Sequence, residues 1–259
     1  MAYDSSFIVA ALRRHPIWRD ADDTALRLLV QGARVEDSRP GQMLVREGQP
    51  ADRIHLLVDG AARTFYVATR ARPELTVKLL RSPSAFGDVA CVLRGPYSAS
   101  IEALTQVRTL AIDAPTYFSA LLRSPAPCFR QYFDLAERFG GATQIEKSTY
   151  AASLHERIVA LLAAYARELG IPVEGGIQID AALTQDDIAS QTGSNRRTVV
   201  RSLGLLYESG ALKRHGRKYV VTSVDALLLA TPGEVPDMVH STRQTTWLEE
   251  LLSARAEGR

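Results

Sequence analysis

Basic side chains gather in one short stretch of the sequence, residues 195–218. Seven arginines and lysines stand there against a single acid, Glu208, although the whole chain has a formal net charge of only +2. The basic residues are Arg196, Arg197, Arg201, Lys213, Arg214, Arg217 and Lys218. Phosphates bind to local basic faces of this kind, and a guanidinium group can donate to both O6 and N7 of guanine. These residue types therefore predict recognition of double-stranded DNA.

The same region contains the signals of two helices and a turn that would hold these side chains. Thr184 precedes an acidic first turn, Asp186 and Asp187, as the N-cap of a helix does. Gly193 supplies a tight turn, and either Ser194 or Asn195 caps a second helix. The inner faces of the two helices are Leu183, Ile188 and Ala189, and Val199, Leu203 and Leu206. The pattern predicts a helix-turn-helix.

The second helix then carries its arginines on the outer face, and a basic hairpin follows it. Residues 212–215 and 217–221 form two short strands that turn at Gly216, a wing able to touch phosphate or the minor groove. The residues expected to contact DNA are Thr184, Ser194, Asn195, Arg196, Arg197, Thr198, Arg201, Lys213, Arg217 and Lys218. A surface helix with ordinary solvated arginines is the simpler alternative, and the ordered set of cap, turn, helix and hairpin favours DNA binding over it.

The rest of the chain predicts a sensor-like β domain followed by a long helix. With 259 residues and 46% hydrophobic content, the chain can bury the cores of two domains. Short helices are expected over residues 7–35. Strands are expected at 43–45, 54–58, 62–67, 75–80 and 107–112, with glycines between them, which is typical of a β-sandwich or roll. Residues 170–176 are expected to form a loop.

Beyond Pro125 and Pro127 the chain is expected to be helical to about residue 169. Along it runs a nearly heptad apolar ladder: Phe129, Tyr132, Ala136, Phe139, Ala142, Ile145 and Thr149. The spacing slips at Gly140 and Gly141, where we expect either a helix end or a hinge in a dimerisation helix. We predict that two subunits pair along residues 127–153.

The segments RPGQMLVREGQPADRIHLLVDGAARTF and SNRRTVVRSL resemble the sensor roll and the recognition helix of the Crp/Fnr family of transcription regulators. The resemblance covers about residues 12–221. It implies an α+β fold: an N-terminal β-roll (a cyclic-nucleotide-binding-like jelly roll), a long dimerisation helix and a C-terminal winged helix-turn-helix. The corresponding domains are residues 1–125, 126–153 and 154–230, followed by an extension, 231–259, whose role is open.

The family resemblance also locates an effector site, and the site is altered. Cyclic-nucleotide-binding members carry Gly-Glu and, about ten residues on, Arg-Ser/Thr-Ala, in which the Glu binds the ribose and the Arg the phosphate. Here the segment reads FGDVACVLRGPYSASIEA. The positions that correspond are Gly87, Asp88, Tyr97, Ser98 and Ala99, with Thr143 on the long helix. A phenol cannot supply the charge that a buried phosphate needs, so we expect no cyclic AMP in the usual pose.

The alternatives at this site are a cyclic nucleotide or dinucleotide bound through an altered phosphate site, or no effector at all. Arg94, three residues upstream of Tyr97, could replace the missing arginine, but a surface role is expected for it. His55 is a haem ligand only by residue type, and a structural role is expected. Cys91 and Cys128 form no CxxC pair, and both are expected to be small buried side chains.

The remaining expectations concern partners and location. The resemblance implies a homodimer on a two-fold symmetric operator, with RNA polymerase as a further partner. Arg197 stands where the family usually has Glu, so the half-sites should differ from TGTGA at one base pair. No P-loop, GxSxG or HExxH motif suggests an enzyme, and no metal site is expected. A cytoplasmic protein without a membrane span or signal peptide is expected.

Overall fold

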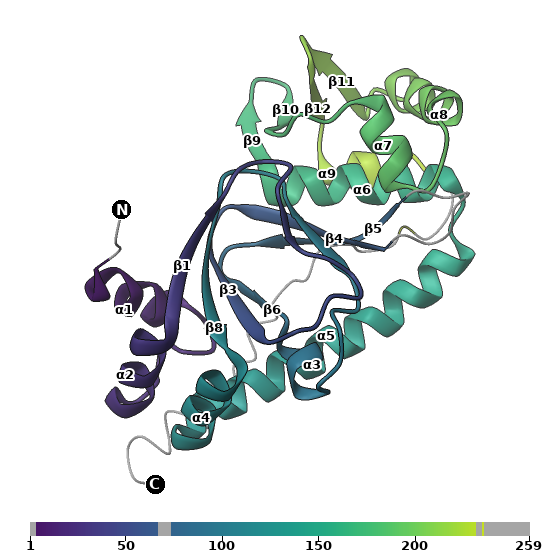
Figure 1. The fold of residues 1–259 in the computed structure, drawn as a ribbon. Helices are drawn as coiled ribbons and strands as arrows, with labels where there is room; N and C mark the ends of the chain where they lie inside the picture. Colours follow the sequence, from purple (N-terminus) through teal and green to yellow (C-terminus); the bar gives the residue numbers. More distant parts are fainter. Residues whose placement is uncertain (1–3, 67–73, 232–234, 236–259) are drawn as a thin grey trace, which may run out of the picture.

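The computed structural model of the chain describes residues 4–66, 74–231 and 235; over residues 141–151 it describes the helix but not the side chains. Two units follow one another, an N-terminal roll and a C-terminal unit, with the long helix α5 beside the roll (Figure 1). No helix within the described residues is both long enough and apolar enough to span a membrane. Most of the extension, residues 231–259, lies outside the described residues, and its role stays open.

The roll consists of two four-stranded antiparallel sheets. One has the order β1-β8-β3-β6 and the other β2-β7-β4-β5. The strands are β1 (Ala33–Ser38), β2 (Met43–Val45), β3 (Arg53–Asp59), β4 (Ala61–Tyr66), β5 (Leu75–Arg81), β6 (Ser84–Phe86), β7 (Ser100–Ala103) and β8 (Val107–Asp113). Leu57, Phe86, Ile101 and Val107 meet between the sheets in a buried apolar core. The predicted roll is therefore confirmed.

Helices close the outer face of the first sheet. They are α1 (Ser5–Arg14), α2 (Asp23–Gly32) and α4 (Ala114–Arg123), and α3 (Asp88–Val92) lies at the end of β6. Trp18 is fully buried and meets Tyr117 edge to face at 5.1 Å between ring centroids. The strand histidine His55 is buried and stacks on Phe86 at 4.9 Å, so the structural role expected for it fits its surroundings. Cys91 is buried, but Cys128 is exposed, so the expectation of burial was wrong for Cys128.

The long helix α5 (Pro125–Ala151) continues through Gly140 and Gly141 without interruption. The alternative of a helix end at these glycines was therefore wrong. The break falls at Ala152 and Ser153, where the Ser153 side chain accepts a hydrogen bond from Glu156 N and starts α6 (Leu154–Leu169) with a capping box. A local cap thus decides where the chain turns from the long helix into the C-terminal unit.

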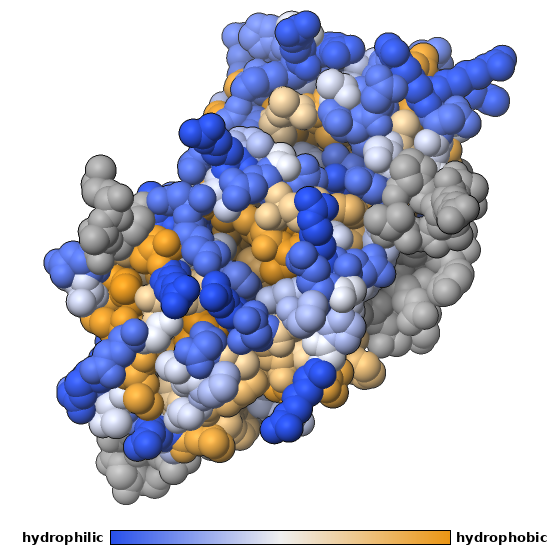
Figure 2. Space-filling model, in the orientation of Figure 1, coloured by the Kyte–Doolittle hydropathy of each residue, from blue (hydrophilic) through white to orange (hydrophobic). Residues whose placement is uncertain are grey.

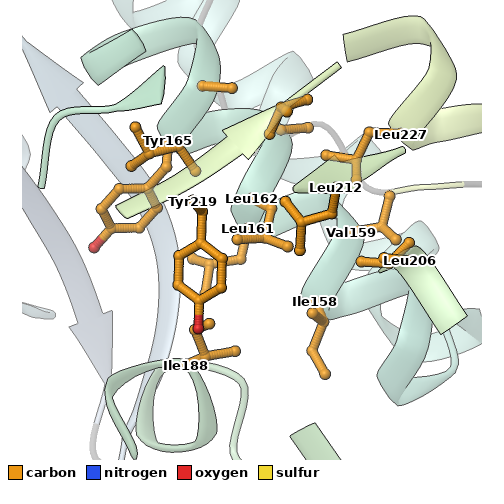
Figure 3. Close-up of a cluster of buried hydrophobic side chains, with 14 of the residues drawn as sticks. Ile158, Val159, Leu161, Leu162, Tyr165, Ile188, Leu206, Leu212, Tyr219 and Leu227 are labelled. Carbon is orange, nitrogen blue, oxygen red and sulfur yellow. The ribbon is translucent and has the colours of Figure 1, made fainter. Parts of the chain in front are cut away.

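The C-terminal unit is built around α6. Its four-stranded sheet has the order β11-β12-β10-β9. The elements are β9 (Gly170–Val173), β10 (Gly176–Ile179), α7 (Gln185–Gln191), α8 (Arg196–Glu208), β11 (Leu212–His215), β12 (Lys218–Val221) and α9 (Val224–Leu229). Figure 3 shows Val159, Leu162 and Leu206 within its buried core. Residues 170–173 pair with β10 as a strand, so the expectation of a loop over 170–176 was wrong there.

Candidate nucleic-acid interface and effector site

Local caps hold the two helices of the helix-turn-helix in place. Thr184 caps α7: its hydroxyl accepts from Asp187 N at 3.1 Å, and its own N–H donates to the Asp187 carboxylate at 2.7 Å. Gly193 turns the chain with a φ of 62°, which favours glycine. Of the two expected caps of α8, Asn195 serves, because its Oδ1 accepts from Thr198 N at 3.0 Å. Ser194 lies half-buried in the turn.

The inner face of α8 fixes the helix against α6. Val199, Leu203 and Leu206 are at most 1% exposed. Ser202 lies on the same face, and its hydroxyl is 2.5 Å from His155 Nδ1 on α6. Because this face is packed and hydrogen-bonded, the opposite face of α8 is held in a defined direction toward solvent.

The arginines of α8 lie on that free side. Arg196, Arg197 and Arg201 are all exposed. Arg196 Nε donates to Gln185 at 3.3 Å, and its guanidinium is 3.7 Å from Asp186. Both partners of this pair are more than 60% exposed, so the pair contributes little and can give way to a phosphate. Arg197 and Arg201 form no salt bridge with any residue that the structure describes.

The wing, residues 212–221, adds further cations. Lys213 is paired across the hairpin with Val220, and His215 with Lys218, and the turn contains Gly216 with a φ of 61°. Lys213 and Arg217 are exposed. Lys218 forms a salt bridge with Asp180, so it is less available to DNA than the sequence suggested. In Figure 2 hydrophilic side chains protrude from the upper part of the molecule, where β11 and α8 lie in Figure 1.

The effector segment begins at Gly87, which has a φ of 89°. A Cβ added to Gly87 would lie 2.7 Å from the carbonyl oxygen of Arg53, so only glycine fits. Asp88 follows as the first residue of α3 and is 4% exposed. Its carboxylate accepts from Gln131 Nε2 at 2.9 Å and forms a salt bridge with Arg138, both on α5. Asp88 is thus already bonded to two side chains of the long helix.

Tyr97 occupies the position where the resemblance implies an arginine. It is buried in the roll, and its hydroxyl donates to the carbonyl oxygen of Arg53 at 3.1 Å. Burial raises the pKa of Tyr97 to about 12, so the phenol stays neutral at physiological pH. Ser98 is exposed, Ala99 is buried, and the side chain of Thr143 lies outside the described residues. The side chain at this position therefore carries no positive charge.

Further charges surround the Asp88 pair. Arg138 Nε also lies 2.8 Å from Asp134. Lys78 on β5 is mostly buried beside them, and desolvation together with the Arg138 charge lowers its pKa to about 8. Arg138 and Gln131 were not singled out in the sequence. Their spacing to Asp134, three and four residues along one helix, places all three on one face, which was the only available signal.

Two other features of the structure bear on the site. Arg94 is exposed, with a φ of 52°, and lines an open groove of about 770 Å³ together with Asp52 and Phe118. Its surroundings fit the surface role expected for it. No cluster of three or more His, Cys, Asp or Glu side chains suited to a metal ion occurs among the described residues.

A polar seam joins the helix-turn-helix to the roll. Gln191, the last residue of α7, accepts hydrogen bonds from the Tyr165 hydroxyl at 3.0 Å and from the Thr76 hydroxyl at 3.4 Å. On the other side of Thr76, Arg63 bonds to its hydroxyl at 3.2 Å and to Glu74 at 2.7 Å. The seam thus connects β4 and β5 of the roll with the end of α7.

Comparisons with known proteins match both units. Residues 35–124 match the family of cyclic nucleotide-binding domains, and residues 156–229 match the Crp-like helix-turn-helix domain. The chain is 32% identical over 196 residues to the global nitrogen regulator of Synechococcus elongatus, covering 74% of this chain and 87% of that protein. It is 22% identical over 216 residues to the CRP-like cAMP-activated global transcriptional regulator of Mycobacterium tuberculosis, covering 83% and 96%. Among solved structures, the c-di-GMP responsive global regulator of Xanthomonas campestris superposes with a TM-score of 0.65 at 17% identity, covering 77% and 99%.

Proposed function

The chain belongs to the Crp/Fnr family of transcription regulators, and on that basis we propose that it binds a two-fold symmetric DNA operator as a homodimer. The observation that carries the proposal is the outward face of α8, where Arg197 and Arg201 are exposed on a helix whose other face is packed against α6. Two such helices about 34 Å apart would enter successive major grooves. DNA and RNA polymerase, in the cytoplasm, are the partners that this activity implies.

The dimer contact we propose is the exposed apolar side of α5. Phe129, Tyr132, Leu135 and Phe139 are 41%, 67%, 41% and 77% exposed in the single chain. Large apolar side chains at such spacing on a long helix are typical of a helix-pairing surface. Pairing there would remove these side chains from water and hold two recognition helices in a fixed relation.

The operator sequence that we propose depends on the side chain of Arg197. At the corresponding position the family usually carries a glutamate, which accepts a hydrogen bond from cytosine N4. The arginine side chain has only hydrogen-bond donors, so it binds guanine or phosphate instead. The preferred half-sites should therefore differ from TGTGA at the base pair that Arg197 meets.

The effector site supports a regulator that does not take cyclic AMP in the usual pose. The residue at the phosphate position, Tyr97, is neutral and bonded to the backbone, and Asp88 is bonded to α5. A cyclic nucleotide would have to displace these bonds, and the side chain at position 97 would supply no cation for its phosphate. The second candidate is a nucleotide or dinucleotide bound through other groups, and a thermal-shift panel of cyclic mono- and dinucleotides separates the two.

The direct test is binding-site selection from a random DNA library with the full chain, followed by fluorescence anisotropy. We expect one palindromic site, bound with a salt dependence that reports several phosphate contacts. Arg197→Ala should weaken this binding, whereas the control Arg123→Ala, an equal loss of charge at an exposed position on α4, should not. Failure to enrich any sequence would refute the proposed function.

A further inference from the structure

Gly204 lies in the middle of α8, where glycine is a poor choice. Relative to alanine, a glycine inside a helix lowers the helix equilibrium roughly fivefold. Close packing often explains such a residue, but a Cβ added to Gly204 meets no other atom of the described residues within 4 Å. Its backbone is also not in the left-handed region, so no local conformation requires it. Nothing in the part of the chain that the structure describes accounts for Gly204.

The position of Gly204 on the helix indicates which molecule would lie next to it. Arg197, Val200, Arg201 and Gly204 are spaced three, one and three residues apart, so they share a sector about 100° wide. The centre of this sector is opposite the buried face that contains Leu203 and Leu206. Gly204 therefore lies on the face that the two unpaired arginines define as the DNA-facing side.

Val200 is the apolar member of this face. It is 47% exposed between the two arginines, one helical turn before Gly204. A β-branched side chain gains little by facing water in a helix. In the major groove, the one apolar group on the base edges is the C5-methyl of thymine, and aliphatic side chains contact it.

We propose that the bare backbone at Gly204 lets α8 approach the duplex closely, and that this approach seats Val200 on a thymine methyl in each half-site. The inference rests on the proposed DNA binding and adds to it a base that no hydrogen bond from an arginine would specify. The thymine would lie beside the base pairs contacted by Arg197 and Arg201.

The first experiment removes the methyl group from the DNA. In the selected operator, each thymine is replaced in turn by deoxyuridine, which pairs identically but lacks the C5-methyl. For the full chain we expect one position per half-site whose replacement weakens binding about fourfold, the loss for one buried carbon group. Val200→Ala should bind the unmodified operator more weakly and should lose the sensitivity to deoxyuridine. Leu205→Ala, an exposed truncation on the flank of the same helix, should keep that sensitivity.

The second experiment fills the gap at Gly204. Because the added methyl meets only open space, Gly204→Ala should raise the melting temperature of the free protein. The same variant should bind the operator at least tenfold more weakly, so stability and affinity move in opposite directions. The inference is overturned if no deoxyuridine position weakens binding, if Val200→Ala retains the sensitivity, or if Gly204→Ala binds as tightly as the parent. Each of these results requires a selected operator, so they are distinct from failure of DNA binding itself.

Discussion

Replacing Arg138 by methionine should destabilise the roll strongly, because it leaves the Asp88 carboxylate buried without its cation. The side chain of Asp88 is 6% exposed and that of Arg138 18% exposed. Removing one partner of a buried salt bridge costs about 3–5 kcal/mol. Gln131 still donates to Asp88 in the variant, so we expect the lower end, about 3 kcal/mol. For a chain of this size that corresponds to a melting temperature roughly 6–12 °C lower.

Replacing the acidic partner of the pair should cost less. In Asp88→Asn the guanidinium of Arg138 keeps its contact with Asp134 at 2.8 Å and remains partly hydrated, so about 1 kcal/mol is expected. The double variant should lie near Asp88→Asn, since no uncompensated buried charge is left. The double-mutant cycle therefore predicts a coupling of about 3 kcal/mol, the amount by which the two single costs together exceed the cost of the double variant.

The assay is urea unfolding of the four proteins at pH 7, followed through the fluorescence of Trp18, which is fully buried in the same unit. If the two single substitutions cost similar amounts and add within about 0.5 kcal/mol, the pair is not coupled. Asp88 would then not be engaged by α5 and would be available to a ligand.

Three further predictions concern α8, α5 and the buried histidine of the roll. Arg201→Ala should cost about 1–3 kcal/mol of operator binding and relax specificity at one base pair, checked by repeating the binding-site selection; equal weakening on all sequences would contradict base reading. Phe139→Glu should convert the dimer to a monomer in analytical ultracentrifugation, because it places a charge in the proposed α5 contact, and an unchanged sedimentation coefficient would place the interface elsewhere. Burial lowers the pKa of His55 to about 4, so its neutral form stabilises the fold above pH 6.5, and this contribution, at most about 3 kcal/mol, is lost as the pH falls toward 4. His55→Phe should lack that part of the acid destabilisation in urea titrations from pH 7 to 4.5, and parallel curves for both proteins would refute the assignment.

The helix-turn-helix could be predicted almost residue by residue because its signals are local. The Thr184 and Asn195 caps act on backbone groups three residues away. Gly193 and Gly216 supply the positive φ that their two turns require. The inward face of α8 repeats at helical spacing within thirteen residues. Such patterns lie within short segments, so they can be recognised without knowledge of the rest of the fold.

Elements that depend on distant partners were missed. The short strands β1, β6 and β7 were not among the predicted ones, although each pairs with a strand elsewhere in the chain. Helix α4 has only ten residues, and its place is set by packing on α2 and β8. Short segments contain too few residues to show the hydrophobic periodicity of a helix or a strand. Their conformation is therefore decided by the strand or helix that they pack against.

At the effector site, the residue types could be interpreted from the sequence, but their bonding partners could not. Comparison of residue types with the family pattern was enough to show that Tyr97 removes the phosphate-binding cation and that Asp88 replaces a glutamate. Tertiary packing brought Asp88 against Arg138, fifty residues along the chain, because α5 lies beside α3. Packing likewise joins Gln191 on α7 to Thr76 of the roll, 115 residues away. Charge and donor type are properties of single residues, whereas partnership depends on how separate elements pack, which no local pattern encodes.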